Sequence, residues 1–412
     1  MSPGAIASMN DDLISEPATL GPQGLRGLFN RLQDQQPEGG RLEAFVEEVF
    51  AELSRELHLA AVLVYAERRD SFELRIGYGG YPAPVDPVPK DCPCLRLVLQ
   101  HRVYIFADPL EPASPWTCRL LPCQPAAGVV VGRRPHRHAL FFLLEEGWVR
   151  DHVDFALNVL RAGLGLRLLE ERVQSNLREA AEVQESLLRE EPPVLPGFEI
   201  ACRSLPAELV SGDFCDFVHV SHDLVGFAVG DAAGHGLPAA LLVRDVVTGL
   251  RMGLEKHLRM EYVFSKLNRV IHRSNLSSRY VSLFYGELET NGNLAYVNAG
   301  HQPPLLARKD RLQELRMGGA VIGPLPDVTF RRGFLRLDPG NVLVLLTDGL
   351  VERKGLRGEF FGEERLKTLV QENYETPAGD LADRILEATL AHGGGQPWDD
   401  DVTLMVVRRQ GE

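Results

Sequence analysis

The stretch QPWDDDVTLMVV, residues 396–407, places three successive carboxylates directly before an apolar run. Asp399, Asp400 and Asp401 are followed by a segment whose length and β-branched content predict a buried strand. Carboxylates held together at a strand edge repel one another, and the repulsion grows as the surroundings become less polar. A positively charged group or a bound cation is therefore expected to offset these charges.

Acidic residues mark three other strand edges in the same half of the chain. The apolar runs LVGFAVG and NVLVLLT lead into Asp231 and Asp348, and Asp213 opens the run DFCDFVHV. Because the end of one antiparallel strand lies beside the start of its neighbour, we expect Asp213, Asp231, Asp348 and Asp400 to gather on one rim. Any one of them alone would be interpreted as a turn residue or helix cap. Together, as oxygen ligands without histidine or thiolate, they predict a pair of magnesium or manganese ions.

The surrounding pattern predicts a mixed α+β domain. Short apolar runs alternate with two helical patterns, and Asn291-Gly292 predicts a tight hairpin between two strands. Glycines surround Asp231 in GDAAGHGLPAALL, just before a helix, where backbone groups can approach a ligand. The segment fits neither the Walker nor the dinucleotide pattern, so nucleotide binding is not indicated.

Six segments, in this order, resemble the landmarks of the SpoIIE/RsbU-type serine phosphatases, the bacterial branch of the metal-dependent protein phosphatase (PPM) superfamily. They are LVSGDFCDF, VGDAAGHGLPAALL, YVSLFYGELETNGNLAYVNAGHQPPLL, GNVLVLLTDGLVE, EFFGEERL and DDDVTL. The resemblance covers about residues 180–408. It implies an α-β-β-α sandwich of antiparallel sheets with a two-metal centre at one end.

The resemblance also implies roles for the rim residues. Asp231 is similar to the ligand shared by both metals, the backbone carbonyl of Ala232 to the next ligand, and Asp348 and Asp400 to the other metal-binding acids. Asp213 matches the acid of the first motif, which acts directly or through water. No catalytic side chain is expected beyond these ligands and the water that the two ions, manganese or magnesium, activate.

Among the three acids of the opening stretch, Asp400 is the expected ligand because it begins the D-D-x-T pattern. Asp401 and Thr403 are expected to orient the strand, and Asp399 is interpreted as a solvated loop acid. Two departures from the family pattern, Ser211 in the first motif and His235 in the second, bear on substrate preference more than on the metal ligands.

The implied activity is hydrolysis of phosphoserine or phosphothreonine on a protein, and the implied partner is an anti-sigma-factor antagonist. His301 and Asn298 of the NAGH segment are interpreted as scaffold residues. A metal-dependent nuclease is disfavoured because the chain has no basic stripe. A dimeric signalling scaffold with a vestigial metal site remains the alternative.

The predicted phosphatase domain spans residues 192–412. The residues before it have a different pattern of apolar and polar residues. Residues 1–40 are interpreted as a flexible tail. Residues 41–155 resemble a GAF-type sensor domain in layout: a helix, two strands, a proline-rich and largely irregular segment over residues 81–135, two strands and a helix. The cysteine pairs there, Cys92 with Cys94 and Cys118 with Cys123, match zinc-ribbon spacing poorly and are interpreted as ordinary thiols.

Residues 156–191 predict a helical linker. Apolar residues recur every seven positions at Leu166, Val173, Ala180 and Leu187, with Leu169, Asn176 and Val183 between them. This spacing predicts a short parallel coiled coil and hence a homodimer. The alternative is one amphipathic helix packed on its own domain.

Composition excludes some functional classes. The 412 residues are 44% hydrophobic and 25% charged, as in a globular protein, and carry a formal net charge of −13. This charge argues against nonspecific binding to nucleic acid or anionic membranes. No run of about 18 apolar residues predicts a membrane span, and the N-terminal segment has no secretory pattern, so a cytoplasmic location is expected.

Overall fold

The computed structural model describes residues 46–47, 50–51, 53–55, 57–80, 87–106, 127–188, 191–254, 259–274, 280–309 and 311–411. The chain divides into two compact units, Met1–Gln174 and Ser175–Glu412. The predicted tail, half of the first predicted helix (residues 41–58), Cys118 and Cys123 lie outside the described residues. No helix within the described ranges is both long and apolar enough to cross a bilayer.

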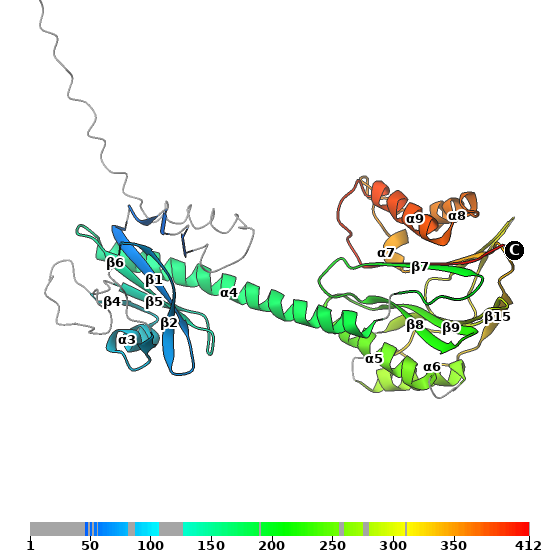
Figure 1. The fold of residues 1–412 in the computed structure, drawn as a ribbon, viewed down its shortest axis with the longest axis horizontal. Coiled ribbons are helices and arrows are strands. Elements are labelled where there is room, and N and C mark those ends of the chain that lie inside the picture. Colours follow the sequence, from blue (N-terminus) through cyan, green and yellow to red (C-terminus); the bar gives the residue numbers. More distant parts are fainter. Residues whose placement is uncertain are drawn as a thin grey trace, which may run out of the picture. The chain divides into compact units, whose positions relative to one another are not determined.

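The first unit contains one six-stranded sheet, with the strand order β3-β2-β1-β6-β5-β4 (Figure 1). Its elements are β1 (Leu59–Glu67), β2 (Ser71–Gly79), β3 (Val88–Pro89), α3 (Pro93–His101), β4 (Val103–Ile105), β5 (Ala127–Val131) and β6 (His138–Leu144). The two predicted hairpins, β1–β2 and β5–β6, are confirmed.

The expectation that residues 81–135 are largely irregular is wrong for the described part of that segment. It holds helix α3 and strands β3 and β4. Pro93 lies in the first turn of α3, where a proline costs no hydrogen bond. Cys92 and Cys94 are buried in the adjacent hydrophobic core, with no more than 4% of either residue exposed, as expected of ordinary thiols.

Alternate residues of the central strands β1 and β6 face two different cores. Val62, Val64 and Phe142 pack in the core shared with helix α4 (Arg150–Leu187), whereas Leu63 and Phe141 pack in the core shared with α3. Side chains of a strand point alternately to its two faces, so this sheet is covered by a helix on each side.

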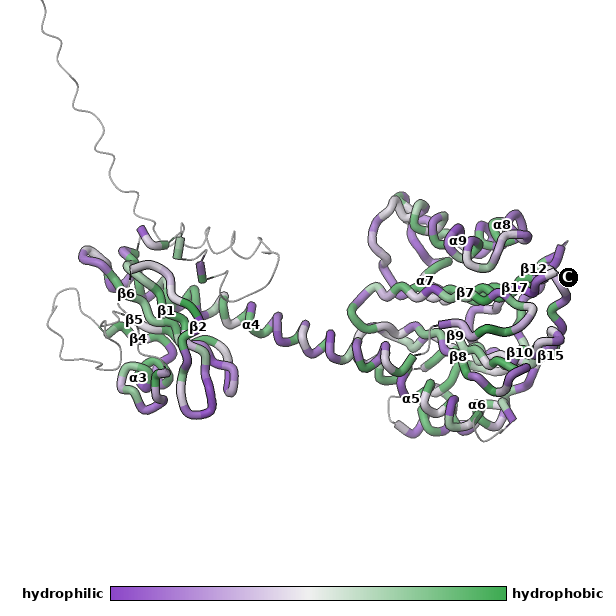
Figure 2. Tube along the Cα trace, in the orientation of Figure 1, coloured by the Kyte–Doolittle hydropathy of each residue, from purple (hydrophilic) through white to green (hydrophobic). Residues whose placement is uncertain are grey.

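Helix α4 is continuous over 38 residues and includes most of the helical linker predicted over residues 156–191. Its side chains are buried only in the first half, up to Leu164. Apolar heptad positions beyond that point remain exposed on the chain, among them Leu166 at 47%, Leu169 at 56%, Val173 at 49% and Val183 at 61%. Figure 2 shows the alternation of polar and apolar residues along this helix. The coiled-coil dimer stays a prediction.

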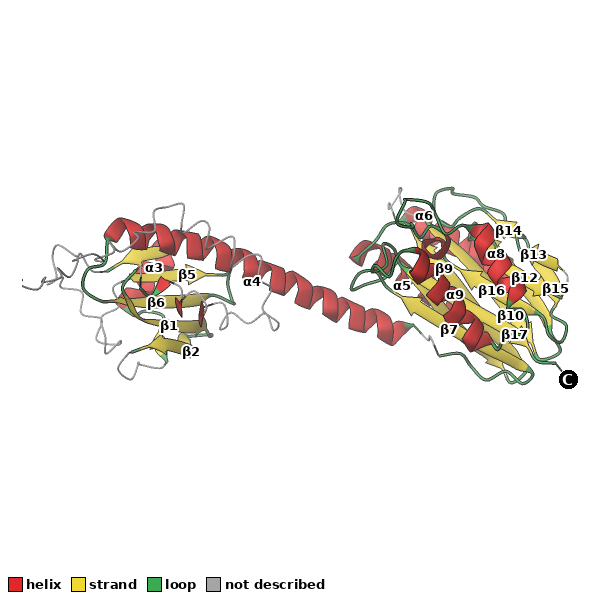
Figure 3. Ribbon diagram, turned by 90° about the horizontal axis from the view of Figure 1, so that it is seen from above, coloured by secondary structure: helices red, strands yellow, loops and turns green. Residues whose placement is uncertain are grey.

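The second unit is built on two sheets, which Figure 3 shows from above. One has the order β14-β11-β10-β9-β8 with β15 on β11, and the other has the order β13-β12-β16-β17-β7. The strands are β7 (Phe198–Leu205), β8 (Asp213–Ser221), β9 (Leu224–Ala232), β10 (Val281–Glu289), β11 (Asn293–Ala299), β12 (Leu305–Arg308), β13 (Arg311–Glu314), β14 (Gly318–Gly319), β15 (Gly333–Arg336), β16 (Val342–Leu346) and β17 (Val402–Arg409). Every pair is antiparallel except β11–β14.

Helices cover the outer faces of these two sheets (Figure 1). They are α5 (Leu237–Leu254), α6 (Met260–Arg273), α7 (Asp348–Val351), α8 (Glu363–Glu372) and α9 (Ala378–His392). Phe227, Phe284 and Met405 belong to the core between the sheets, and separate cores lie under α5 and α6 and under α7, α8 and α9. The predicted α-β-β-α order of layers is therefore present in this unit.

The hairpin predicted at Asn291-Gly292 joins β10 to β11. Gly292 has a φ of +96°, a conformation that favours glycine. The Asn291 side chain accepts a hydrogen bond from the backbone N–H of Asn293 at 2.8 Å. This turn fixes the register of the sheet that carries two of the rim acids.

Candidate metal centre

Asp213 and Asp231 lie opposite each other on neighbouring strands. Asp213 is the first residue of β8, Asp231 is near the end of β9, and the two are register partners. Asp213 is only 3% exposed. Ala232, one residue further along β9, donates its N–H to the carbonyl of Gly212 at 3.0 Å. The alternation of strand ends and starts thus places this pair of carboxylates side by side, as predicted.

The second sheet contributes Asp348 and Asp400 from adjacent antiparallel strands. Strand β16 ends at Leu346, and Asp348 opens the short helix α7 two residues later, while Asp400 lies two residues before β17. A Cβ atom added to Gly349 would lie 2.2 Å from the backbone oxygen of Asp401 and 3.4 Å from the Cβ of Asp400. Only glycine therefore lets the Asp348 turn approach the acidic stretch this closely.

Asp401 and Thr347 connect the two sheets at this end of the sandwich. The carboxylate of Asp401 accepts hydrogen bonds from the backbone N–H groups of Ala207 and Gly212, both at 2.8 Å. The hydroxyl of Thr347 donates to Asp213 at 2.5 Å and accepts from the N–H of Thr403 at 2.9 Å. These contacts hold the loop before Asp213 against the acidic stretch, so all four predicted rim acids lie at one end of the unit.

Burial and mutual repulsion shift the acid pKa values in this cluster. The pKa of Asp213 is raised well above its usual value, first by burial and then by the charge of Asp231. The pKa of Asp231 is raised to about 7 by burial, with Asp348 and Asp400 adding to the effect. Burial also raises the pKa of Asp400, with Asp348 and Asp401 adding to it. The carboxylates are thus close enough to disfavour one another's charge.

The described part of the chain supplies little counter-charge to these acids. There, no arginine or lysine forms an ion pair with Asp213, Asp231, Asp348 or Asp400. Hard oxygen donors with an excess of negative charge fit magnesium or manganese. No three of the described His, Cys, Asp and Glu side chains, however, are arranged closely enough to form a ready-made metal site. Ions would have to draw these carboxylates together.

The loop before Asp213 is also held by the end of helix α4. The Gln184 amide donates to the carbonyl oxygen of Ser211 at 2.7 Å, and its oxygen accepts from the Ser211 N–H at 3.2 Å. The Ser211 hydroxyl accepts from the N–H of Asp213 at 3.0 Å. The serine at this departure from the family pattern therefore positions the backbone of a rim acid.

His235, the other departure, lies on the loop between β9 and α5. Its side chain is 82% exposed and pairs with Glu208, with Nδ1 and Oε1 3.0 Å apart. It lies near enough to Asp400 to counter part of the rise in that residue's pKa. His235 is therefore an exposed loop residue near the rim acids.

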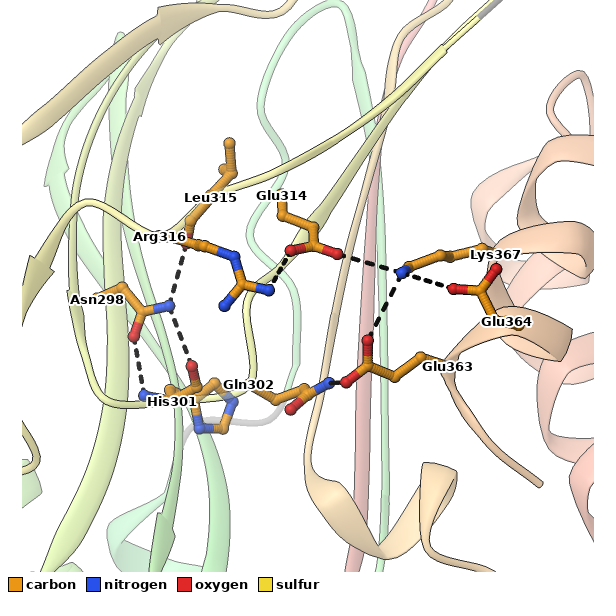
Figure 4. Close-up of polar contacts among 9 residues, drawn as sticks. All are labelled: Asn298, His301, Gln302, Glu314, Leu315, Arg316, Glu363, Glu364 and Lys367. Carbon is orange, nitrogen blue, oxygen red and sulfur yellow. Dashed lines mark hydrogen bonds and ion pairs between the residues drawn. The ribbon is translucent and has the colours of Figure 1, made fainter. Parts of the chain in front are cut away.

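His301 is a scaffold residue, as Figure 4 illustrates. Its backbone N–H donates to Asn298 at 2.8 Å, and the Asn298 amide donates back to its carbonyl at 3.1 Å. Its ring bonds Ser282 at 2.8 Å, and burial lowers its pKa to about 4. The next residue, Gln302, donates to Glu363 of α8 at 2.9 Å. A neutral, buried imidazole in such a network is suited to holding a loop and unsuited to donating protons.

Arg353 is a structurally important residue that the sequence did not indicate. It is 2% exposed, and it donates to the carbonyl oxygens of Gln396 and Pro397 at 2.6 and 2.7 Å. Its guanidinium also lies over the ring of Trp398, 5.2 Å from the ring centroid. Arg353 thereby fastens the loop of the acidic stretch to the chain just after Asp348. No local pattern distinguishes it, because these partners of its side chain lie more than 40 residues away in the sequence.

Comparisons with known proteins bear on the family of the second unit. The family model described as Stage II sporulation protein E (SpoIIE) matches residues 221–410. Phosphoserine phosphatase RsbU of Bacillus subtilis is 29% identical over 248 residues, which cover 60% of this chain and 73% of RsbU. Protein IcfG of Synechocystis is 26% identical over 262 residues, and the match spans 57% of this chain but only 41% of IcfG.

A solved structure supports the fold. The SiaA-PP2C domain of Pseudomonas aeruginosa superposes with a TM-score of 0.52 at 22% identity, covering 58% of this chain and 98% of that domain. The ordered motifs, the four-layer unit and the matching family model thus point to one assignment. The second unit, in which the matched residues lie, is therefore a SpoIIE/PP2C-type phosphatase domain.

Proposed function

We propose that this chain is a cytoplasmic, metal-dependent phosphatase that removes phosphate from phosphoserine or phosphothreonine on a protein partner. The observation that carries the proposal is the cluster of aspartates at one end of the sandwich. Burial and neighbouring carboxylates raise the pKa values of Asp213, Asp231 and Asp400, and no described lysine or arginine forms an ion pair with the cluster. The name of the Bacillus relative, a phosphoserine phosphatase, supports the substrate class.

The proposed centre holds two manganese or magnesium ions. Asp231, the carbonyl oxygen of Ala232, Asp348 and Asp400 would bind them, with Asp213 as a further ligand or a water-mediated one. Ions bound there would neutralise the phosphoryl oxygens and make a water nucleophilic at neutral pH. The chain's own contribution is to bring the acids together, and the hydrogen bond from Thr347 orients the carboxylate of Asp213.

Partner and control are further parts of the proposal. We infer that the substrate is an anti-sigma-factor antagonist and that the first unit, a GAF-like sensor, regulates hydrolysis. Residues 156–191 would join two copies through the exposed apolar heptad positions, such as Leu169 and Val183. The hydrogen bonds between Gln184 and Ser211 connect that helix directly to the loop before Asp213.

Removal of metal tests the proposal. In excess EDTA the purified chain is expected to lose hydrolysis of a phosphoserine peptide, because the clustered carboxylates cannot activate water by themselves. Addition of manganese or magnesium beyond the chelator is expected to restore the activity, measured as released phosphate. A chain that is equally active in EDTA would contradict the metal mechanism.

A non-catalytic signalling scaffold is the second candidate, favoured by the lack of a ready-made metal site among the described residues. If no phosphorylated protein or peptide is hydrolysed with any divalent ion, while the chain still binds a phosphorylated antagonist, the scaffold interpretation is correct.

Gln184→Ala is expected to lower kcat by up to about 30-fold, because two hydrogen bonds of about 1 kcal/mol each position the backbone before Asp213. Gln184 does not contact the rim carboxylates, so KM for the peptide should stay unchanged. The matched control is Glu185→Ala, an exposed neighbour on the same helix. A rise in KM at constant kcat would count against this positioning role.

A further inference from the structure

A cationic cavity lies in the first unit. It has a volume of about 540 Å³ and is formed where the turn after β1 meets the turn between β5 and β6. Its lining is rich in basic residues, which are Arg68, Arg69, Lys90, Arg134 and His136. This concentration of positive charge is unexpected in a chain whose formal net charge is −13.

The floor of the cavity is a buried carboxylate shared by two cations. Glu67 is 8% exposed, and it accepts two hydrogen bonds at 2.7 Å from the guanidinium of Arg137, itself 6% exposed. Lys90 donates to the same carboxylate at 2.9 Å. These hydrogen bonds, from Arg137 first, lower the pKa of Glu67 to about 2. The single negative charge of Glu67 is thus paired with the positive charges of Arg137 and Lys90. These three groups together keep a net positive charge.

The rim adds positive charge that the neighbouring acids do not balance. Arg68 pairs with Glu73 at 2.7 Å. Arg69 and Arg134, by contrast, form no ion pair with any acidic residue in the described ranges. Both are exposed, so their guanidinium groups are available to a ligand at the mouth of the cavity.

We propose that this cavity binds a small multivalent oxyanion, such as a compound carrying two or more phosphate or carboxylate groups. Guanidinium groups match these anions by paired, charge-assisted hydrogen bonds. The volume lies within the range of small-molecule sites, about 300–1,000 Å³, and exceeds what a single phosphate needs. The absence of large apolar side chains from the described lining makes a mainly apolar ligand unsuitable. The site is independent of the proposed phosphatase activity.

Isothermal titration of the full chain with inorganic pyrophosphate tests this site. The chain is first freed of metal by dialysis and the titration is run without a chelator, since a polycarboxylate such as EDTA would compete for the proposed site. The wild type is expected to bind, and Arg69→Ala combined with Arg134→Ala is expected to weaken binding at least tenfold. Both arginines are exposed, so the double variant should fold. Binding should also weaken as salt is raised, since the attraction is between charges.

The matched control is Arg75→Ala, an exposed arginine on β2 that does not line the cavity. It should bind pyrophosphate as the wild type does. Citrate, titrated in parallel, distinguishes a preference for carboxylates from one for phosphates, and tight binding of either at Arg69 and Arg134 supports the site. The proposal is overturned if neither anion binds at millimolar concentration. It is equally overturned if the double variant binds like the wild type, or if Arg75→Ala loses as much affinity as the double variant.

Discussion

Asp348→Asn is expected to lower phosphatase turnover at least about 100-fold, because even residues that only orient a metal ligand cost about 10–100-fold when replaced. The amide keeps the size of the carboxyl group, and the close approach of Gly349 to Asp401 is unaffected. What is lost is the negative charge that the proposed ions need. The measurement is kcat on a phosphoserine peptide over a range of manganese concentrations.

Asp399→Asn is the matched control, since it makes the same chemical change in the neighbouring acidic stretch. The Asp399 side chain is 71% exposed, pairs with Arg353 at 3.2 Å and is not one of the proposed metal ligands. Its turnover should stay within about twofold of the wild type, as for a typical exposed substitution. Wild-type turnover by Asp348→Asn, with the fold intact by circular dichroism, would refute the proposed metal centre.

The grouping of the acids could be predicted because it depends on local patterns. Apolar runs identify the strands, and antiparallel pairing puts the end of one beside the start of the next. That is why Asp213 and Asp231, although 18 residues apart, are register partners. The hairpin at Asn291-Gly292 could also be predicted from the sequence, because its type of turn requires particular residues.

The supporting contacts could not be predicted, because they are made by residues far apart in sequence. Arg353 binds carbonyl groups of Gln396 and Pro397, and carbonyl groups carry no sequence signal. Gln184 fits a helical pattern equally well whether or not it touches Ser211. Helix α3 was missed for a different reason: prolines dominate its neighbourhood, and a proline in the first turn of a helix is easily mistaken for a helix breaker.

Asp231→Asn is expected to stabilise the metal-free protein while it abolishes turnover. The pKa of Asp231 is raised from 3.8 to about 7 by burial and by Asp348 and Asp400. Above pH 7 the folded protein must therefore hold a charge that its surroundings disfavour. A shift of this size corresponds to about 4 kcal/mol if it is fully expressed, and we expect about 2 kcal/mol because the cluster relaxes. The neutral amide removes this cost.

The effect depends on pH in a definite direction. Between pH 3.8 and about 7 the folded chain holds a proton on Asp231 that the unfolded chain has lost. The free energy of unfolding of the metal-free wild type therefore rises as the pH falls through 7, as far as this group determines it. In Asp231→Asn that dependence should be weaker. The advantage of the variant should accordingly be large at pH 8 and small near pH 5.

Urea unfolding in EDTA at pH 8 and pH 5 measures both effects. Asp223→Asn serves as the control, because Asp223 lies in the turn at the opposite end of the same two strands, with a side chain that is 75% exposed. With manganese present the order should reverse, since bound ions stabilise a cluster that keeps all its carboxylates. The metal-free Asp231→Asn variant could instead prove less stable than the wild type at pH 8. That result would contradict the proposal that bound ions relieve repulsion among these aspartates.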